Sequence, residues 1–115
     1  MSKHLDVKIT LFDILGCAKK CIEFTKEMSF DSFVNDPKTI SAVLHQLMVM
    51  GEAVNRLGSE FESQNPVLPW RKIAGTRNVL IHHYEGTDLK IVWDVLQLNI
   101  PVVAEEVEKL LAKQN

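Results

Sequence analysis

The segment Arg77-Asn78-Val79-Leu80-Ile81-His82-His83-Tyr84 is the most informative part of this 115-residue chain. It places polar and titratable side chains inside a stretch whose apolar residues follow the spacing of a packed helix. Arginine and histidine are seldom buried in such a helix without a partner or a function. Arginine binds phosphate with a planar fork of N–H groups, and histidine can transfer a proton near neutral pH. Cleavage of RNA without a metal would need this pair of groups.

The helix around this segment should run from about Pro69 to Tyr84 and end near Gly86, because proline favours a first turn and glycine a C-cap. At about 100° per residue, an apolar stripe surrounds Arg77, whereas His82 lies about 140° away. The stripe contains Trp70, Ile73, Ala74, Leu80, Ile81 and Tyr84, and the opposite line contains Arg71, Gly75, Asn78 and His82. To act on one phosphate, the two residues need a distorted helix end, a long reach by the arginine, or a second copy of the motif in a twofold dimer.

The rest of the chain also has helical periodicity, with only weak strand signals. A first helix is expected from about Leu5 to Lys26 and a second from Pro37 to Leu57. Asp36 before Pro37 is a strong start signal, because the carboxylate can cap the helix and proline suits its first turn. The segment from Met28 to Asn35 is expected to be a loop.

After the motif, Thr87 or Asp88 can cap a further helix. The sequence Asn99-Ile100-Pro101 interrupts that helix, so the remainder is either a final helix or a kinked continuation. These patterns predict an all-α bundle of about four to five helices, forming a single domain over residues 1–115.

Charge and hydropathy restrict the class of protein. The net charge is −2 and the pI is about 6.1, which argues against a generally basic nucleic-acid coat protein. This charge is compatible with a local basic patch, because no acidic residue occurs between Trp70 and Tyr84. No apolar run approaches the roughly 20 residues of a membrane span, and the N-terminus has no signal-peptide core. We therefore expect a cytoplasmic protein without a membrane partner.

Several candidate residues have a structural alternative. Arg77 could form a buried ion pair, with Glu52 or Asp94 as its partner. Glu52 could orient Arg77 or His82, or it could pair with Arg56 one helical turn later. His82 alone could be a structural histidine, and Tyr84 alone could be a packing aromatic with its hydroxyl at the rim.

Cys17 and Cys21 lie four residues apart on one helical face, and no nearby histidine completes a zinc spacing. We expect both to be buried free thiols. A histidine with one glutamate, His45 and Glu52, is too little for a metal site. The chain also has no glycine-rich phosphate loop. The sequence therefore predicts no metal and no cofactor.

The motif and its flanks resemble the HepT-like branch of the HEPN superfamily. That branch has an arginine, four residues, a histidine, one residue and a tyrosine, which are matched here by Arg77, His82 and Tyr84. The flanking blocks that also agree are Gly51-Glu52-Ala53, Pro69-Trp70-Arg71-Lys72-Ile73-Ala74-Gly75, Asp88-Leu89 and Ile91-Val92-Trp93. The likeness covers almost the whole chain.

The resemblance implies an α-helical homodimer with the motifs lining a cleft at the dimer interface. It also implies a ribonuclease toxin of a toxin–antitoxin pair, encoded beside an MntA-type nucleotidyltransferase antitoxin. In that family the antitoxin transfers AMP from ATP to the motif tyrosine and silences the toxin. The corresponding residue here is Tyr84.

We hypothesise roles for the remaining residues. His82 is the general acid/base and Arg77 the phosphate clamp. Asn78, Glu52 and Arg71 are candidates for positioning the substrate or the histidine. A place near the helix C-terminus favours the protonated form of His82, so it should act better as an acid than as a base.

Two other functions remain open from the sequence. The chain could be a non-catalytic helical partner, or a nucleotide-binding subunit, of a nucleotidyltransferase. It could also be a structural dimerisation module in which Arg77 is buried and paired. RNA cleavage separates the ribonuclease from both alternatives.

Overall fold

The computed structural model describes the backbone of residues 3–82 and 88–114, and the side chains of residues 5–77 and 88–114. Almost all of these residues are helical, and no strand occurs within these ranges. The helices are α1 (Lys3–Phe24), α2 (Phe30–Val34), α3 (Pro37–Leu57), α4 (Ser59–Gln64), α5 (Trp70–His82), α6 (Leu89–Asp94), the π-helix η1 (Val95–Asn99) and α7 (Ile100–Ala112). The expected all-α fold is confirmed.

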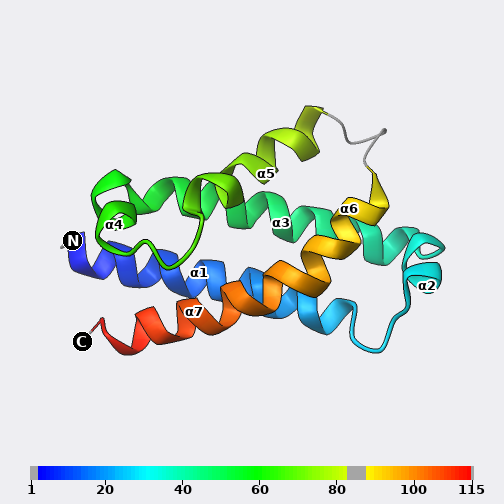
Figure 1. The fold of residues 1–115 in the computed structure, drawn as a ribbon, viewed down its shortest axis with the longest axis horizontal. Coiled ribbons are helices and arrows are strands. Elements are labelled where there is room, and N and C mark those ends of the chain that lie inside the picture. Colours follow the sequence, from blue (N-terminus) through cyan, green and yellow to red (C-terminus); the bar gives the residue numbers. More distant parts are fainter. Residues whose placement is uncertain (1–2, 83–87, 115) are drawn as a thin grey trace.

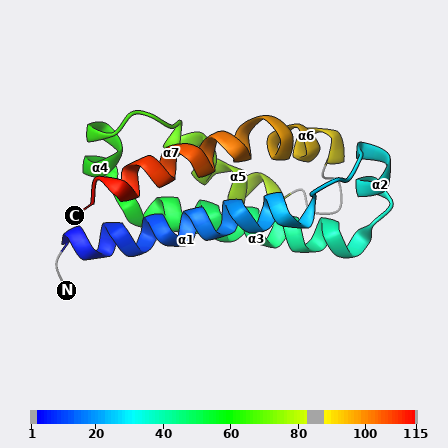
Figure 2. The same cartoon turned by 90° about the horizontal axis from the view of Figure 1, so that it is seen from below.

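The helices α1, α3 and α7 form the body of the bundle. α1 packs against both α3 and α7, whereas α5 makes its main contact with α3 (Figure 1). The short α4 lies at the same end as the start of α1 and the end of α7, and α2 lies at the opposite end (Figure 2). Since α5 rests chiefly on one neighbour, its position depends on how closely it approaches α3.

The core contains buried apolar side chains from each of the described helices. The largest fully buried side chains are Phe33, Leu11, Ile14, Met50, Val43, Val54, Val107 and Cys21. Cys17 and Cys21 are both buried free thiols, as predicted. Burial raises the pKa of Cys21 to about 12 and also raises that of Cys17, because a thiolate is poorly solvated in the core. None of the helices in residues 3–82 and 88–114 combines the length and the apolar composition that a membrane span requires.

The helix α3 begins and ends where the sequence predicts. Asp36 is its N-cap, and its carboxylate accepts a hydrogen bond from the backbone N–H of Thr39 at 3.1 Å. Pro37 occupies the first turn, where a missing N–H costs nothing. The helix ends at Leu57, and its C-cap is Gly58, whose φ of 88° lies in a region that glycine adopts readily and other residues rarely do.

Two short helices were not predicted. The expected loop from Met28 to Asn35 contains α2, which begins with a capping box between Ser29 and Ser32. The other is α4, which follows directly after Gly58. Both are too short to show a helical period in the sequence. The capping box could have revealed α2, whereas α4 has no side-chain cap at its N-terminus.

The elements α6, η1 and α7 form one continuous helical stretch. The sequence left open a separate helix or a kinked continuation, and the continuation is observed. Pro101 has no N–H to donate to the preceding turn, and in a regular α-helix its ring would crowd the carbonyl of Gln97. The turn before it widens into a π-helix, in which the N–H of Ile100 donates to the carbonyl of Val95, five residues earlier.

Candidate functional site

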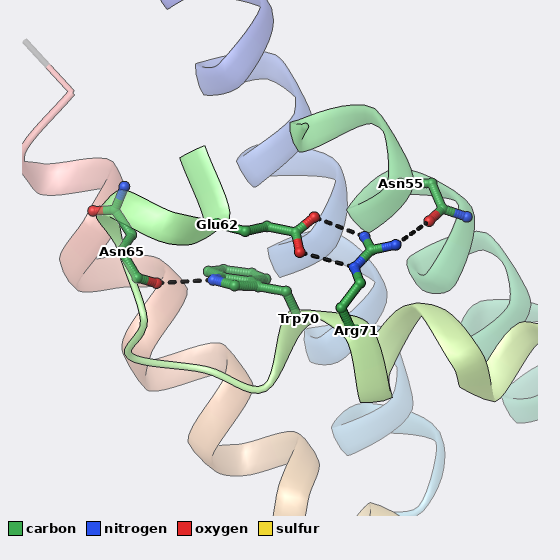
Figure 3. A network of polar contacts seen from close by, with 5 residues as sticks. All are labelled: Asn55, Glu62, Asn65, Trp70 and Arg71. Carbon is green, nitrogen blue, oxygen red and sulfur yellow. Dashed lines mark hydrogen bonds and ion pairs between the residues drawn. The ribbon is translucent and has the colours of Figure 1, made fainter. Parts of the chain in front are cut away.

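The start of α5 is fixed by a buried tryptophan. Trp70 is 3% exposed, and its indole N–H donates to the backbone carbonyl of Asn65 at 2.8 Å (Figure 3). The ring of Phe61 packs edge-on against it with a centroid distance of 5.9 Å. The helix that carries the predicted motif therefore begins at a rigid point beside α4.

Arg71 is held by polar groups from two other helices. Its Nε and Nη2 donate to the two carboxylate oxygens of Glu62 at 2.8 and 2.7 Å, and its Nη1 donates to Oδ1 of Asn55 at 3.2 Å (Figure 3). Glu62 lies on α4 and Asn55 on α3, so the guanidinium joins three helices. This arrangement was not predicted. All three guanidinium nitrogens of Arg71 donate hydrogen bonds within the fold.

Arg77 lies where α5 contacts α3. Its Nε donates to Oε1 of Glu52 at 3.0 Å. The side chain of Arg77 is 35% exposed and that of Glu52 is 53% exposed. Glu52 was one of two predicted partners, and that pairing is confirmed, but the ion pair is partly open to solvent and not buried. Asp94, the other candidate, pairs with Lys90 at 3.2 Å.

The alternative partner expected for Glu52 was wrong. Arg56 reaches instead across to α1, where its Nη2 lies 3.0 Å from a carboxylate oxygen of Asp13. This pairing leaves Glu52 available to Arg77, so an acid on α3 orients the motif arginine. Gly51 lies beside it, and the backbones of α3 and α5 approach closely there.

The structure describes the remaining motif residues only in part. The helix α5 extends through His82, but the side chains of Asn78 and His82 lie outside the described residues, as does Tyr84 entirely. Their predicted roles are therefore untested.

The chain after the motif is anchored at Asp88, which caps α6 by accepting from the N–H of Lys90 at 2.9 Å. Trp93 of α6 packs against Phe33 and Phe30 of α2, with ring centroids 5.2 and 6.3 Å apart. The ammonium group of Lys90 also lies over the ring of Phe30, at 5.3 Å from its centroid. The segment that carries Tyr84 thus lies in the sequence between the end of α5 and the start of α6. Contacts with α2 hold α6 in place.

A cavity of about 310 Å³ was not predicted. It lies among α3, α5, η1 and α7 and is lined mainly by apolar side chains, with Lys72, Thr76 and Asn99 as its polar groups. A sequence pattern cannot reveal such a space, because it arises where four elements fail to close on one another. Across the part of the chain whose side chains are described, no three histidine, cysteine, aspartate or glutamate residues gather into a possible metal site.

The comparisons with known proteins identify the family. The family described as "Ribonuclease HepT-like" matches residues 14–110. This chain belongs to the HepT-like ribonuclease family. It is 42% identical over 106 residues to "Putative RNase MJ0127" of Methanocaldococcus jannaschii, covering 92% of this chain and 88% of that protein. It is 37% identical over 100 residues to "Probable ribonuclease HepT" of Thermococcus cleftensis, covering 87% and 91%. No solved structure matches it.

Family membership gives the observed geometry a chemical meaning. Arg77 uses one N–H group on Glu52 and has no other ion pair with a described residue. Its terminal nitrogens are thus the groups that a phosphate could bind in a bidentate fashion. Arg71 is already paired in that fashion with Glu62.

Proposed function

We propose that this HepT-like protein is a metal-independent endoribonuclease of the HEPN type, acting in the cytoplasm as the toxin of a toxin–antitoxin pair. The observation that carries the proposal is the state of Arg77, whose side chain is 35% exposed and is oriented by Glu52 through one N–H group. A guanidinium held in this way is ready to stabilise charge on a phosphate without having to be reorganised.

The proposed reaction uses the ribose itself as the nucleophile. A base removes the proton from the 2′-OH, whose oxygen attacks the adjacent phosphorus, and the bond to the 5′ oxygen of the next nucleotide breaks. An acid protonates that leaving oxygen, so the products are a 2′,3′-cyclic phosphate and a 5′-OH. His82 transfers the protons and Arg77 binds the pentavalent phosphorane. Because DNA has no 2′-OH, the substrate is RNA.

The site is proposed to require two copies of the chain. On a regular helix Arg77 and His82 are about 140° apart around the axis. A twofold dimer brings the same surface of both copies together, so the arginine of one copy can meet the histidine of the other. Asn78 would then position the substrate or the histidine within this shared cleft.

Control of the toxin is proposed to act through Tyr84. A partner nucleotidyltransferase of the MntA type would catalyse attack of the tyrosine oxygen on the α-phosphorus of ATP, with pyrophosphate as the leaving group. The added AMP brings a bulky group and a negative phosphate to the motif, and both oppose binding of RNA beside Arg77.

The cleavage test compares matched arginines. Purified protein is incubated with RNA in EDTA, and we expect Arg77→Ala to lower the rate about 100- to 1000-fold and His82→Ala about 100- to 10,000-fold. Arg56→Ala is the control, because Arg56 pairs with Asp13 on the α1 side of α3 and should leave the rate unchanged. Equal cleavage by all the proteins would reject the site.

The same preparation separates the alternative function. A nucleotide-binding partner of a nucleotidyltransferase would bind ATP or AMP, measured by calorimetry, and would leave RNA intact. Binding without cleavage by the unmodified protein would therefore replace the ribonuclease proposal with that one.

The test of control uses the protein with its partner nucleotidyltransferase and ATP. Mass spectrometry of the intact protein and of its peptides should show added AMP at Tyr84, with loss of RNA cleavage. Tyr84→Phe should acquire no AMP and should not be silenced. Modification at another residue, or none, would reject the role of Tyr84.

A further inference from the structure

At Gly51 the helices α3 and α5 approach too closely for any side chain. A Cβ atom built there would lie 2.9 Å from the Cβ of Arg77 and 3.2 Å from the carbonyl oxygen of Ala74. Both of these atoms are fixed to the backbone of α5, so neither can rotate away as the end of a flexible side chain would. Any residue larger than glycine must therefore push α3 and α5 apart.

The next residue of α3 holds the same arginine by its guanidinium. Glu52 accepts from Nε of Arg77 at 3.0 Å. Gly51 thus sets how near the Cα and Cβ of Arg77 lie to α3, and Glu52 sets the direction of the guanidinium. Two consecutive residues fix both ends of one side chain.

Other helical glycines of the described chain do not have this role. A Cβ at Gly16 on α1 or at Gly75 on α5 would meet nothing within 4 Å. Glycine inside a helix is unfavourable relative to alanine, because it loses more backbone freedom on folding. At Gly51 the close contact offers a physical reason for that cost, and at Gly16 the structure offers none.

We propose that Gly51 and Glu52 form a positioning pair that places the guanidinium of Arg77 for the reaction. This inference rests on the proposed ribonuclease function and extends it to residues that touch Arg77 and not the RNA. A displacement of about 1 Å at a reacting group can lower a rate about 100-fold, so a single methyl group at position 51 should be enough to disturb catalysis.

The kinetic test compares Gly51→Ala with Gly16→Ala. We expect kcat for RNA cleavage to fall about 10- to 100-fold in Gly51→Ala, with KM little changed, because the arginine acts mainly on the transition state. Glu52→Gln keeps the size of the side chain but removes its charge, and it should lower kcat in the same manner. Gly16→Ala should retain the wild-type kcat, and circular dichroism at the assay temperature checks that each variant is folded.

A second measurement follows Arg77 without reference to cleavage. In a ¹⁵N–¹H spectrum, the Nε–Hε signal of Arg77, assigned by its absence in Arg77→Lys, should be protected from solvent exchange by Glu52. We expect Gly51→Ala and Glu52→Gln to shift this signal and speed its exchange, and Gly16→Ala to leave it unchanged. A purely structural role of Gly51 would lower the melting temperature without moving this signal in the folded protein.

The outcomes are distinct. Wild-type kcat in folded Gly51→Ala, or an Arg77 signal unchanged by both substitutions, would overturn the positioning pair. If Gly51→Ala does not fold, Glu52→Gln decides the matter, since an unchanged signal or an unchanged kcat in that variant overturns the proposal. If the wild-type protein leaves RNA intact while the signal responds as expected, the proposed function fails and the placement of Arg77 by this pair stands.

Discussion

Two arginines of α5, six residues apart, meet carboxylates in different ways. Arg71 donates from Nε and Nη2 to Glu62 and from Nη1 to Asn55. Arg77 donates from Nε alone to Glu52, and its Cβ lies against Gly51. The backbone at Arg77 is thus closely fitted to α3 while its guanidinium is mostly uncommitted. At Arg71 the guanidinium is engaged and its side chain is 63% exposed.

The difference suggests a division of work along one helix. A guanidinium bound on three of its nitrogens ties α5 to α3 and α4, and it would have to give up those bonds to take a phosphate. A guanidinium bound on one nitrogen can accept a second anion without losing its support. We therefore expect Arg71 to act as a brace for the fold and Arg77 to act on the substrate.

Among tests that compare the two arginines directly, the largest effect is expected from a substitution at Arg77 that keeps the positive charge and removes the planar guanidinium. In Arg77→Lys we expect kcat for RNA cleavage to fall about 10- to 100-fold, because an ammonium group cannot reproduce the planar pair of donors. The same change at Arg71 should leave kcat close to wild type. The kcat values of the two variants are measured in parallel. A wild-type kcat in Arg77→Lys would show that the two arginines do not differ as proposed.

A smaller effect is expected on stability. Removing the Arg71–Glu62 ion pair should lower the free energy of unfolding by about 0.5–1 kcal/mol, which is typical of a well-oriented pair near the surface. A double-mutant cycle with Arg71→Ala and Glu62→Ala, followed by urea denaturation, measures the coupling directly. A coupling near zero together with a raised KM in Arg71→Ala would instead assign Arg71 to the substrate, as the sequence analysis expected.

The outcome of the sequence predictions depended on how local each signal was. The bounds of α3 were predictable, because Asp36 with Pro37 and the later Gly58 are start and stop signals within a few residues of the helix. The pairing of Arg77 with Glu52 was predictable as one of two options, since few acids were available to it. The all-α fold was predictable from the helical periodicity, and the family was predictable from the motif and its flanks.

Other features depended on how distant segments meet. Glu62 lies on α4, which is too short to leave a periodic pattern, so its pairing with Arg71 had no signal in the sequence. The contact at Gly51 depends on the register between α3 and α5 to within one residue. The cavity beside Thr76 depends on the relative positions of four elements, which the sequence pattern does not give. Predictions for Asn78, His82 and Tyr84 stand as they were made, because those side chains lie outside the described residues.

The smallest expected effect is on the acid dependence of stability. It comes from Asp36, whose carboxylate is bound by Thr39 and not by an arginine. Asp36 accepts from the backbone N–H of Thr39 at 3.1 Å and from its hydroxyl at 2.8 Å. These two hydrogen bonds lower the pKa of Asp36 below its ordinary value of 3.8, the backbone bond being the larger cause. The folded state therefore favours the ionised form, so the carboxylate stabilises the protein above the unfolded pKa. That contribution is lost as the pH falls through the lower, folded pKa.

Two substitutions separate this acid-sensitive cap from the arginine pairs. Asp36→Asn can still accept the bond from the backbone, so we expect near wild-type stability at neutral pH and a weaker loss of melting temperature in acid. Thr39→Ala removes only the hydroxyl donor, so the pKa of Asp36 should move part of the way back and the acid dependence should weaken by part of the same amount. Thermal melts of the three proteins across the acidic range measure the slope of melting temperature against pH. A difference in helix propensity between Thr and Ala does not vary with pH, so it does not change this slope. Identical slopes in all three would show that the ionisation of Asp36 does not stabilise α3, and the acid sensitivity of the fold would then have to come from other carboxylates, the two arginine-bound glutamates among them.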